Sequence, residues 1–82
     1  MTVKALESFD GRITIDPGIC NGKPTIRGKR ITVQTILEYL SAGESEVEIL
    51  NQYPSLEIED IRACLRFAAS LMDQRYELAK AA

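Results

Sequence analysis

The chain has 82 residues, 45% of them hydrophobic and 27% charged, with a net charge of −2, a composition that fits one small globular domain and excludes wholesale disorder. It contains no histidine, the commonest general base and metal ligand, and no apolar run approaches the roughly 18 residues of a membrane helix. Because the N-terminus also lacks a signal-peptide pattern, we expect a cytoplasmic protein. Because histidine is missing, we expect no bound metal or cofactor, and an enzyme is the least expected class of protein.

The first third of the chain predicts a short β-arm. Residues 1–11 show no clear periodicity and are expected to form an irregular tail. Residues 12–15 alternate in polarity and are rich in β-branched side chains, which predicts a strand. Turn residues follow at 16–18 and 21–22, and a second extended piece is expected at about 25–31. Because two short strands are marginal alone, we expect the arm to pair with that of a second chain in a homodimer.

Two helices are expected next. The first should begin after Thr32 as its N-cap and end at Gly43. Its apolar residues recur at i, i+3, i+4 and i+7, which is one helical face: Val33, Ile36, Leu37 and Leu40. The second should open on a capping box of Ser45 and Glu48 and stop at Pro54. Its core-facing residues are expected to be Val47, Leu50 and Tyr53, with Ile49 at the edge.

The last helix is expected to begin at residue 57 or 58 and to run to about residue 78. Leu56 and Ile61 flank its start at the spacing of a hydrophobic staple. Its apolar stripe repeats at intervals of three and four: Ile58, Ile61, Leu65, Ala68 and Met72, widened by Cys64 and Leu71.

Three helices with tight connections predict a mainly α fold with a tri-helical helix-turn-helix body. We divide the chain into an N-terminal tail (1–11), a β-arm (12–32) and a three-helix body with an extended last helix (33–82). The two cysteines, Cys20 and Cys64, stand far apart in sequence and are expected to be free thiols.

Several segments occur in an order that is specific in combination: Ile13-Thr14-Ile15-Asp16-Pro17, Gly22-Lys23-Pro24-Thr25-Ile26-Arg27-Gly28-Lys29-Arg30-Ile31, Gly43, Glu48-Ile49-Leu50, Tyr53-Pro54-Ser55-Leu56 and Glu59-Asp60-Ile61. Over roughly residues 12–70 they resemble the bacterial domain-of-unknown-function family numbered 433. The resemblance implies a homeodomain-like fold and, for some members, a VapB-type antitoxin encoded beside a PIN-like ribonuclease toxin. The family usually has Thr or Ser where this chain has Glu57, which weakens the expected cap of the last helix by about 1 kcal/mol, and often Thr where this chain has Lys29.

Charge is distributed unevenly, with six Lys/Arg and three acids in residues 1–32 but seven acids and no base in residues 33–60. Cations of the arm and the last helix are therefore candidates for nucleic-acid contacts: Arg12, Lys23, Arg27, Lys29, Arg30, Arg62 and Arg66. A conventional recognition helix is less expected, because Glu57, Glu59 and Asp60 at its start would repel DNA. The alternative role of the arm cations is ion pairing that holds the arm to the helices, Arg27 and Arg30 with Glu38, Glu44 and Glu48.

The last helix extends beyond what a three-helix core can cover, and an amphipathic end of this kind is typical of partner binding. Its candidate contacts are Phe67, Leu71, Arg75, Tyr76 and Leu78. The alternatives are a dimer contact or plain packing at the helix end. By resemblance we expect an antitoxin-like component of a toxin–antitoxin pair, which binds and inhibits a PIN-like ribonuclease and has its operator DNA as a further expected partner. The alternatives are a DNA-binding transcriptional regulator without a toxin partner, and a dimeric protein-interaction module.

Overall fold

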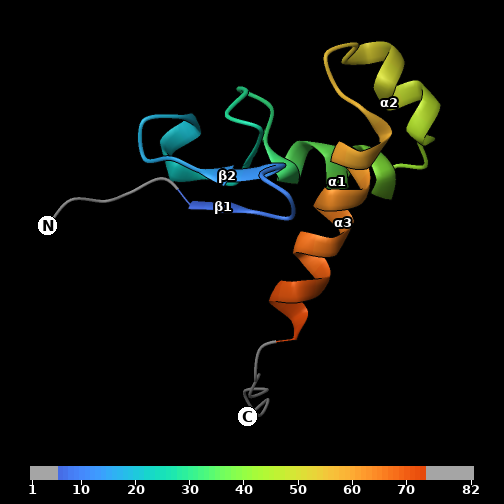
Figure 1. The fold of residues 1–82 in the computed structure, drawn as a ribbon. Coiled ribbons are helices and arrows are strands. Elements are labelled where there is room, and N and C mark those ends of the chain that lie inside the picture. The colour runs from blue at the N-terminus through green and yellow to red at the C-terminus, as the bar shows by residue number, and fades with distance from the viewer. Residues whose placement is uncertain (1–5, 74–82) are drawn as a thin grey trace, which may run out of the picture.

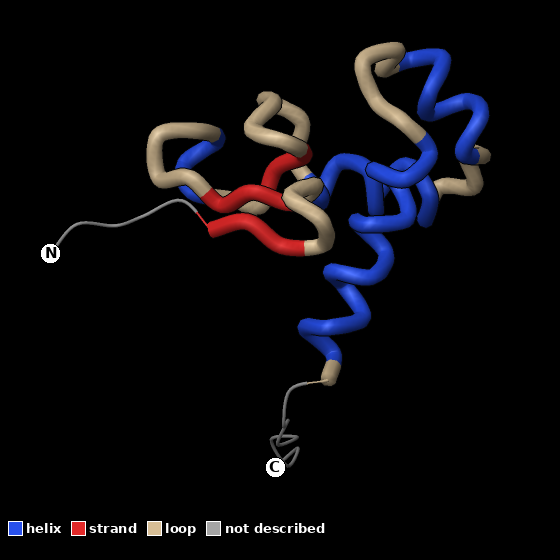
Figure 2. Tube along the Cα trace, viewed as in Figure 1, coloured by secondary structure: helices blue, strands red, loops and turns tan. Residues whose placement is uncertain are grey.

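The computed structural model describes the backbone of residues 6–73 and the side chains of residues 9–73 (Figure 1). In chain order the elements are β1 (Leu6–Ser8), β2 (Ile13–Ile15), a short 3₁₀ segment (Cys20–Gly22), β3 (Thr25–Ile26), α1 (Val33–Ser41), α2 (Glu46–Gln52) and α3 (Ile58–Met72). The small sheet lies beside the helices, and α3 runs past α1 and away from α2 (Figures 1 and 2). The predicted mainly α class, with three helices behind a short β-hairpin, is confirmed. None of the helices described is long and apolar enough to cross a membrane.

The three strands form one antiparallel sheet in the order β1-β2-β3. Ile13 of β2 lies opposite Ile26 of β3, and both are buried, so this cross-strand pair anchors the sheet to the core. β1 was not predicted, because three residues are too few to show a periodicity. It gives the arm a third strand from the same chain, so the sheet does not require a second chain to be completed.

A tight turn connects β1 to β2. Phe9, Asp10 and Gly11 have positive φ angles of 56°, 61° and 74°, and the Arg12 N–H donates to the Phe9 carbonyl oxygen at 3.1 Å. Asp-Gly is a strong hairpin signal, so Asp10-Gly11 could have revealed this hairpin from the sequence. The turn places Phe9 against α3. The ring of Phe9 contacts the ring of Phe67 edge-on, with 6.0 Å between the ring centroids.

The predicted caps of the first two helices are confirmed. Thr32 begins α1, and its Oγ1 accepts a hydrogen bond from the Thr35 N–H at 3.1 Å. At the start of α2, the Glu48 N–H donates to Ser45 Oγ at 3.2 Å and the Ser45 N–H donates to Glu48 Oε1 at 2.8 Å. Gly43, just beyond α1, has φ 95°, a conformation that glycine adopts without steric cost.

One core joins the sheet to all three helices: Ile13, Ile26, Val33, Ile36, Ile49, Leu56, Ile61, Ala63 and Cys64. Leu50 and Tyr53 pack against it as predicted. The prediction for the rest of α2 is wrong, because Ile49 is fully buried whereas Val47 is 66% exposed. α2 is only about two turns long and packs against both α1 and α3, so this packing, and not the hydrophobic pattern, selects its inward face.

The buried face of α3 is also rotated relative to the predicted stripe. Ile61 and Cys64 are buried as predicted, but Leu65 and Met72 are 46% and 70% exposed. Asp60 occupies an inward position on the first turn and is fully buried. A hydrophobic pattern cannot predict an inward carboxylate, because such a group is buried only when cations from elsewhere in the fold reach it.

Candidate partner-binding site

The buried carboxylate of Asp60 joins the β-arm to the start of α3. Arg27 meets it as a fork, with Nε donating to Oδ1 at 3.0 Å and Nη2 donating to Oδ2 at 2.7 Å. Arg12 Nη1 donates to the same Oδ1 at 2.8 Å and to Glu57 Oε1 at 2.9 Å. The Glu57 N–H completes the arrangement by donating to Asp60 Oδ2 at 2.8 Å. We call Arg12, Arg27, Glu57 and Asp60 the ionic cluster.

The ionic cluster keeps Asp60 charged. Burial by itself would raise the pKa of Asp60, but the hydrogen bonds from Arg27, from the Glu57 N–H and from Arg12 outweigh it, and the pKa lies below its ordinary value. Hydrogen bonding to Asp60 is the main cause that raises the pKa of Arg27, and hydrogen bonding to Glu57 is the main cause for Arg12. The carboxylate and both guanidinium groups are therefore ionised near neutral pH, so the buried charge of Asp60 is paired.

The loop that delivers Arg27 has a strained backbone. The Lys29 N–H donates to the Ile26 carbonyl oxygen at 2.8 Å, which closes a two-residue turn where Arg27 and Gly28 have φ angles of 48° and 70°. Glycine adopts this conformation readily, whereas for an arginine it costs about 1 kcal/mol. The fork to Asp60, and a further bond from Arg27 Nη2 to the Ser55 carbonyl oxygen at 2.9 Å, offset that cost. The strain is located where the side chain is needed to hold the arm to α3.

The cations predicted to contact nucleic acid differ in their surroundings. Arg12 and Arg27 belong to the ionic cluster. Arg62 Nε lies 3.6 Å from Glu46 Oε2, and the guanidinium carbon of Arg66 lies 5.7 Å from the centroid of the Phe9 ring. The remaining three are on the segment between the 3₁₀ turn and α1, where Lys23 and Arg30 are exposed and Lys29 is half-buried.

The alternative predicted for the arm, ion pairing with acids of the helices, holds for Arg27. Its partner, however, is Asp60 rather than an acid of the predicted set, Glu38, Glu44 and Glu48. The role of Asp60 was missed, since it was interpreted only as an acid at a helix N-terminus. A sequence signal exists, because an acid at the third position of a helix whose cap is not Ser or Thr can itself bond the cap N–H, as Asp60 does for Glu57.

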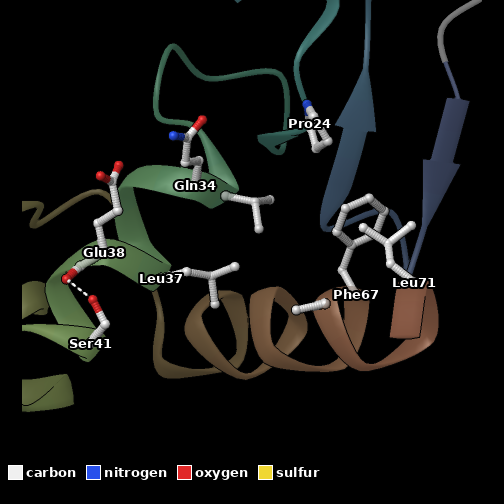
Figure 3. A pocket seen from close by; sticks show the side chains of 9 residues that line it. Pro24, Gln34, Leu37, Glu38, Ser41, Phe67 and Leu71 are labelled. Carbon is white, nitrogen blue, oxygen red and sulfur yellow. Dashed lines mark hydrogen bonds between the residues drawn. The ribbon is translucent and has the colours of Figure 1, made fainter. Parts of the chain in front are cut away.

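An apolar groove of about 410 Å³ opens between α1 and α3 (Figure 3). One wall comes from α1, the other comes from α3, and Pro24 lies at one end. The apolar lining residues are Pro24, Val33, Leu37, Phe67, Ala68 and Leu71, and the polar ones, all on α1, are Gln34, Glu38 and Ser41. A groove of this size and composition is suited to burying the apolar face of another molecule.

Two of the residues predicted to contact a partner, Phe67 and Leu71, line this groove. The other three, Arg75, Tyr76 and Leu78, lie outside the described residues. The opposite wall was not foreseen, because Val33 and Leu37 were assigned only to the core and Pro24 only to the arm. A groove between two helices is a property of their packing, which no single helical pattern encodes.

The two cysteines differ in their burial. Burial raises the pKa of the Cys64 thiol to about 12, and the charge of Asp60 adds to the effect, so this thiol stays protonated near neutral pH. Cys20 is half-buried and, like Cys64, a free thiol, as predicted. Within residues 6–73, no group of three or more Cys, Asp or Glu side chains is placed to hold a metal ion.

Comparison with known proteins relates this arrangement to a family. The family described as a protein of unknown function (DUF433) matches residues 13–68. The chain belongs to the DUF433 family. The matched DUF433 segment runs from β2 into α3, and so contains Arg27 and Asp60 of the ionic cluster together with Phe67 and Ala68 of the groove.

Two similar proteins extend the comparison. The crystal structure of a DUF433 member from Anabaena variabilis ATCC 29413 matches with a TM-score of 0.69 and 37% identity, over 72% of this chain and 58% of that one. The uncharacterized protein y4eO of Sinorhizobium fredii (strain NBRC 101917 / NGR234) is 36% identical over 56 residues, which are 68% of this chain. The chain spans only 25% of the length of y4eO, so a similar segment there forms one part of a longer protein.

Proposed function

We propose that this DUF433 chain is an antitoxin-like protein-binding module whose partner docks in the groove between α1 and α3. The groove is the observation that supports the proposal, since six of its lining residues are apolar and no residue of the described range 9–73 fills it. Apolar surface of this kind is a feature of protein interfaces. The family resemblance supplies the class of partner, a PIN-like ribonuclease that the contact would silence.

The lining favours a protein segment over a small polar substrate. Sites for small molecules bring a few polar groups together from several directions to fix one orientation. Here the polar lining residues Gln34 and Glu38 are one turn apart on α1, while Phe67, Ala68 and Leu71 make the facing wall apolar (Figure 3). Two helices that face each other in this way leave a trough suited to a third, the arrangement in which amphipathic helices are bound by grooves.

Co-expression tests the proposal. The product of the neighbouring reading frame is purified with this chain, and its ribonuclease activity is measured with and without the chain. Ala68→Arg places a long cation in the groove, and Ala69→Arg places the same cation on the exposed neighbouring position of α3, so the two variants form a matched pair. We expect inhibition by the unmodified chain and by Ala69→Arg and its loss with Ala68→Arg. A nuclease that stays fully active with the unmodified chain would contradict the antitoxin class, and equal behaviour of the two variants would contradict the groove.

A DNA-binding regulator is the second candidate, supported by the exposed side chains of Lys23 and Arg30. Such a protein would not read DNA with the start of α3, where Asp60 is buried under Arg12 and Arg27. Its affinity for upstream DNA should fall steeply with salt, and Arg30→Glu should weaken it. Arg30 suits this test better than Arg27, whose loss would disturb the ionic cluster. No binding at low salt would contradict the regulator.

A dimer through the β-arms also stays a proposal. The outer edge of β3 is already paired within the chain, through the Thr25–Thr32 bridge and the hydrogen bond from the Ile26 N–H to the Ile31 carbonyl oxygen at 3.0 Å. Within residues 6–73, the sheet edge that a second chain could extend is therefore that of β1. Sedimentation equilibrium tests the proposal: a species of twice the chain mass supports it, and a monomer over the micromolar range contradicts it.

A further inference from the structure

Of the described residues that line the groove, one has an ionisable side chain, and it is an acid. Among its lining residues only Glu38 is charged, and this residue is exposed on α1. Ser41 Oγ donates to the backbone carbonyl oxygen of Glu38 at 2.8 Å, so that bond does not involve the carboxylate (Figure 3). Within residues 9–73, no cation is recorded within ion-pair distance of Glu38.

The neighbouring acids differ from Glu38. Glu46 lies 3.6 Å from Arg62, Glu44 accepts from Gln52 Nε2 at 2.9 Å, and Glu48 closes the capping box of α2. The chain has no Lys or Arg between Arg30 and Arg62, so α1 and α2 contain no cation that could serve Glu38. Among residues 9–73, no cation therefore neutralises the carboxylate of Glu38, which is exposed at this wall.

The residues that line each wall of the groove recur every four positions along their helix. Leu37 and Ser41 are separated by four residues along α1, one turn beyond the buried Val33, and Phe67 and Leu71 are separated by four along α3. Side chains spaced by four form a ridge on a helix, and a third helix packs its own ridge into the space between two such ridges. An extended strand would instead need free backbone donors and acceptors along the groove, and both walls are helices whose backbone groups bond internally.

We propose that the groove binds an amphipathic helix of a partner protein, with apolar residues at i, i+3 or i+4 and i+7 against the two ridges and a Lys or Arg opposite Glu38. The inference rests on the proposed function and defines the chemistry of its partner. A pair at the rim of an interface contributes mainly to specificity and to the rate of association. We expect replacement of the partner's cation by an acid to weaken binding about tenfold, since it turns an attraction into a repulsion.

A displayed library of helical peptides, with all positions of one face randomised, tests this inference on the whole chain. Peptides that bind are selected separately on four proteins: the unmodified chain, Glu38→Lys, Ala68→Arg and Ala69→Arg. The four proteins are first shown to unfold at a similar temperature. We expect the unmodified chain and Ala69→Arg to enrich helices with an apolar ridge and one conserved Lys or Arg, and Glu38→Lys to enrich Asp or Glu at that same position. Fluorescence anisotropy with the best peptide and its charge-swapped twin should then give the tenfold preference, reversed on Glu38→Lys.

The outcomes separate the two claims. Groove-dependent peptides with no charge preference, or a preference that Glu38→Lys leaves unchanged, would overturn the inference and leave the binding module intact. Peptides that bind Ala68→Arg and Ala69→Arg equally, or no enriched helix at all, would overturn helix docking in the groove. A dimer of the unmodified chain that Ala68→Arg dissociates would identify a second copy as the occupant, and would overturn the inference as well.

Discussion

The two halves of α3 are used differently. At its start, Asp60 is fully buried and held by Arg12 and Arg27, so this half is closed by the β-arm. Further along, Phe67, Ala68 and Leu71 form one wall of an open apolar groove. Charge is buried where the arm is fastened, and apolar surface is exposed farther along the helix. The first half of the helix therefore fastens the arm, and we propose that the second half, besides the packing of Phe67 on the core, is available to a partner.

This difference bears on how such a domain would use a helix-turn-helix shape. In DNA-binding members of that class, the start of the last helix contacts base edges in the major groove. Here that segment contains Glu57 and Asp60 engaged with the arm. The contrast predicts that changes in the first half of α3 alter stability and that changes in the second half alter binding.

The largest effect is expected from Asp60→Ala. It removes the acceptor that Arg27 and Arg12 share and should lower the free energy of unfolding by about 2–3 kcal/mol, measured by urea denaturation. Glu59→Ala, one residue away and exposed, is the matched control and should cost less than about 1 kcal/mol. Similar losses for both variants would contradict the account of the closed half.

A double-mutant cycle of Arg27→Ala and Asp60→Ala sharpens this result. Because the two side chains share a two-bond fork, their coupling energy should exceed about 1 kcal/mol. Additive losses would show that the fork contributes no energy of its own, even if each single variant is destabilised.

Acid should act through the same carboxylate. The folded-state pKa of Asp60 is lower than its ordinary value, so in acid the unfolded state binds more protons than the folded state. The contribution of Asp60 is therefore present above about pH 4, its unfolded pKa, and is lost as the pH falls through the folded-state pKa. The stability of Asp60→Asn, measured from pH 7 to pH 2, should fall less than that of the unmodified chain over this window. Parallel curves would mean that another group dominates.

A smaller effect is expected at the turn that presents Arg27. Gly28 has φ 70°, and a Cβ added there would meet nothing within 4 Å, so Gly28→Ala tests the backbone alone. It should cost about 1 kcal/mol in thermal or urea unfolding. Asparagine tolerates positive φ better than alanine, so Gly28→Asn should cost less. Equal costs for the two variants would contradict the conformational explanation.

The smallest effect on stability is expected in the open half. Ala68→Arg should change the free energy of unfolding by no more than about 0.5 kcal/mol, because the long side chain can reach water from the groove. Its effect should instead appear in partner binding, as loss of the complex in a pull-down that Ala69→Arg preserves. A large loss of stability in Ala68→Arg would mean that the groove is part of the core.

Local features of this fold could be predicted from the sequence. The caps at Thr32 and Ser45 and the turn at Gly43 depend on contacts within a few residues, so their signals are complete in short segments. Asp60 could not be placed in the same way, since its partners Arg27 and Arg12 are 33 and 48 residues distant. The inward face of α2 was likewise decided by neighbouring helices.

The sequence predicted one of the two walls of the groove, the wall from α3. The amphipathic character of the last helix indicated Phe67 and Leu71 as partner contacts, because that pattern belongs to one helix. The wall from α1 depends on how α1 and α3 pack, and on where the arm places Pro24. Glu38 was considered only as a partner for arm cations, whereas the structure places it on the groove, where no described cation meets it.

The most direct test of the division of α3 is an amide chemical-shift map of the chain during titration with the helical peptide selected on it. We predict that the amides of Leu37, Ala68 and Leu71 shift and that those of Arg27 and Asp60 do not. Shifts centred on Arg27 and Asp60, with the groove unaffected, would contradict the account.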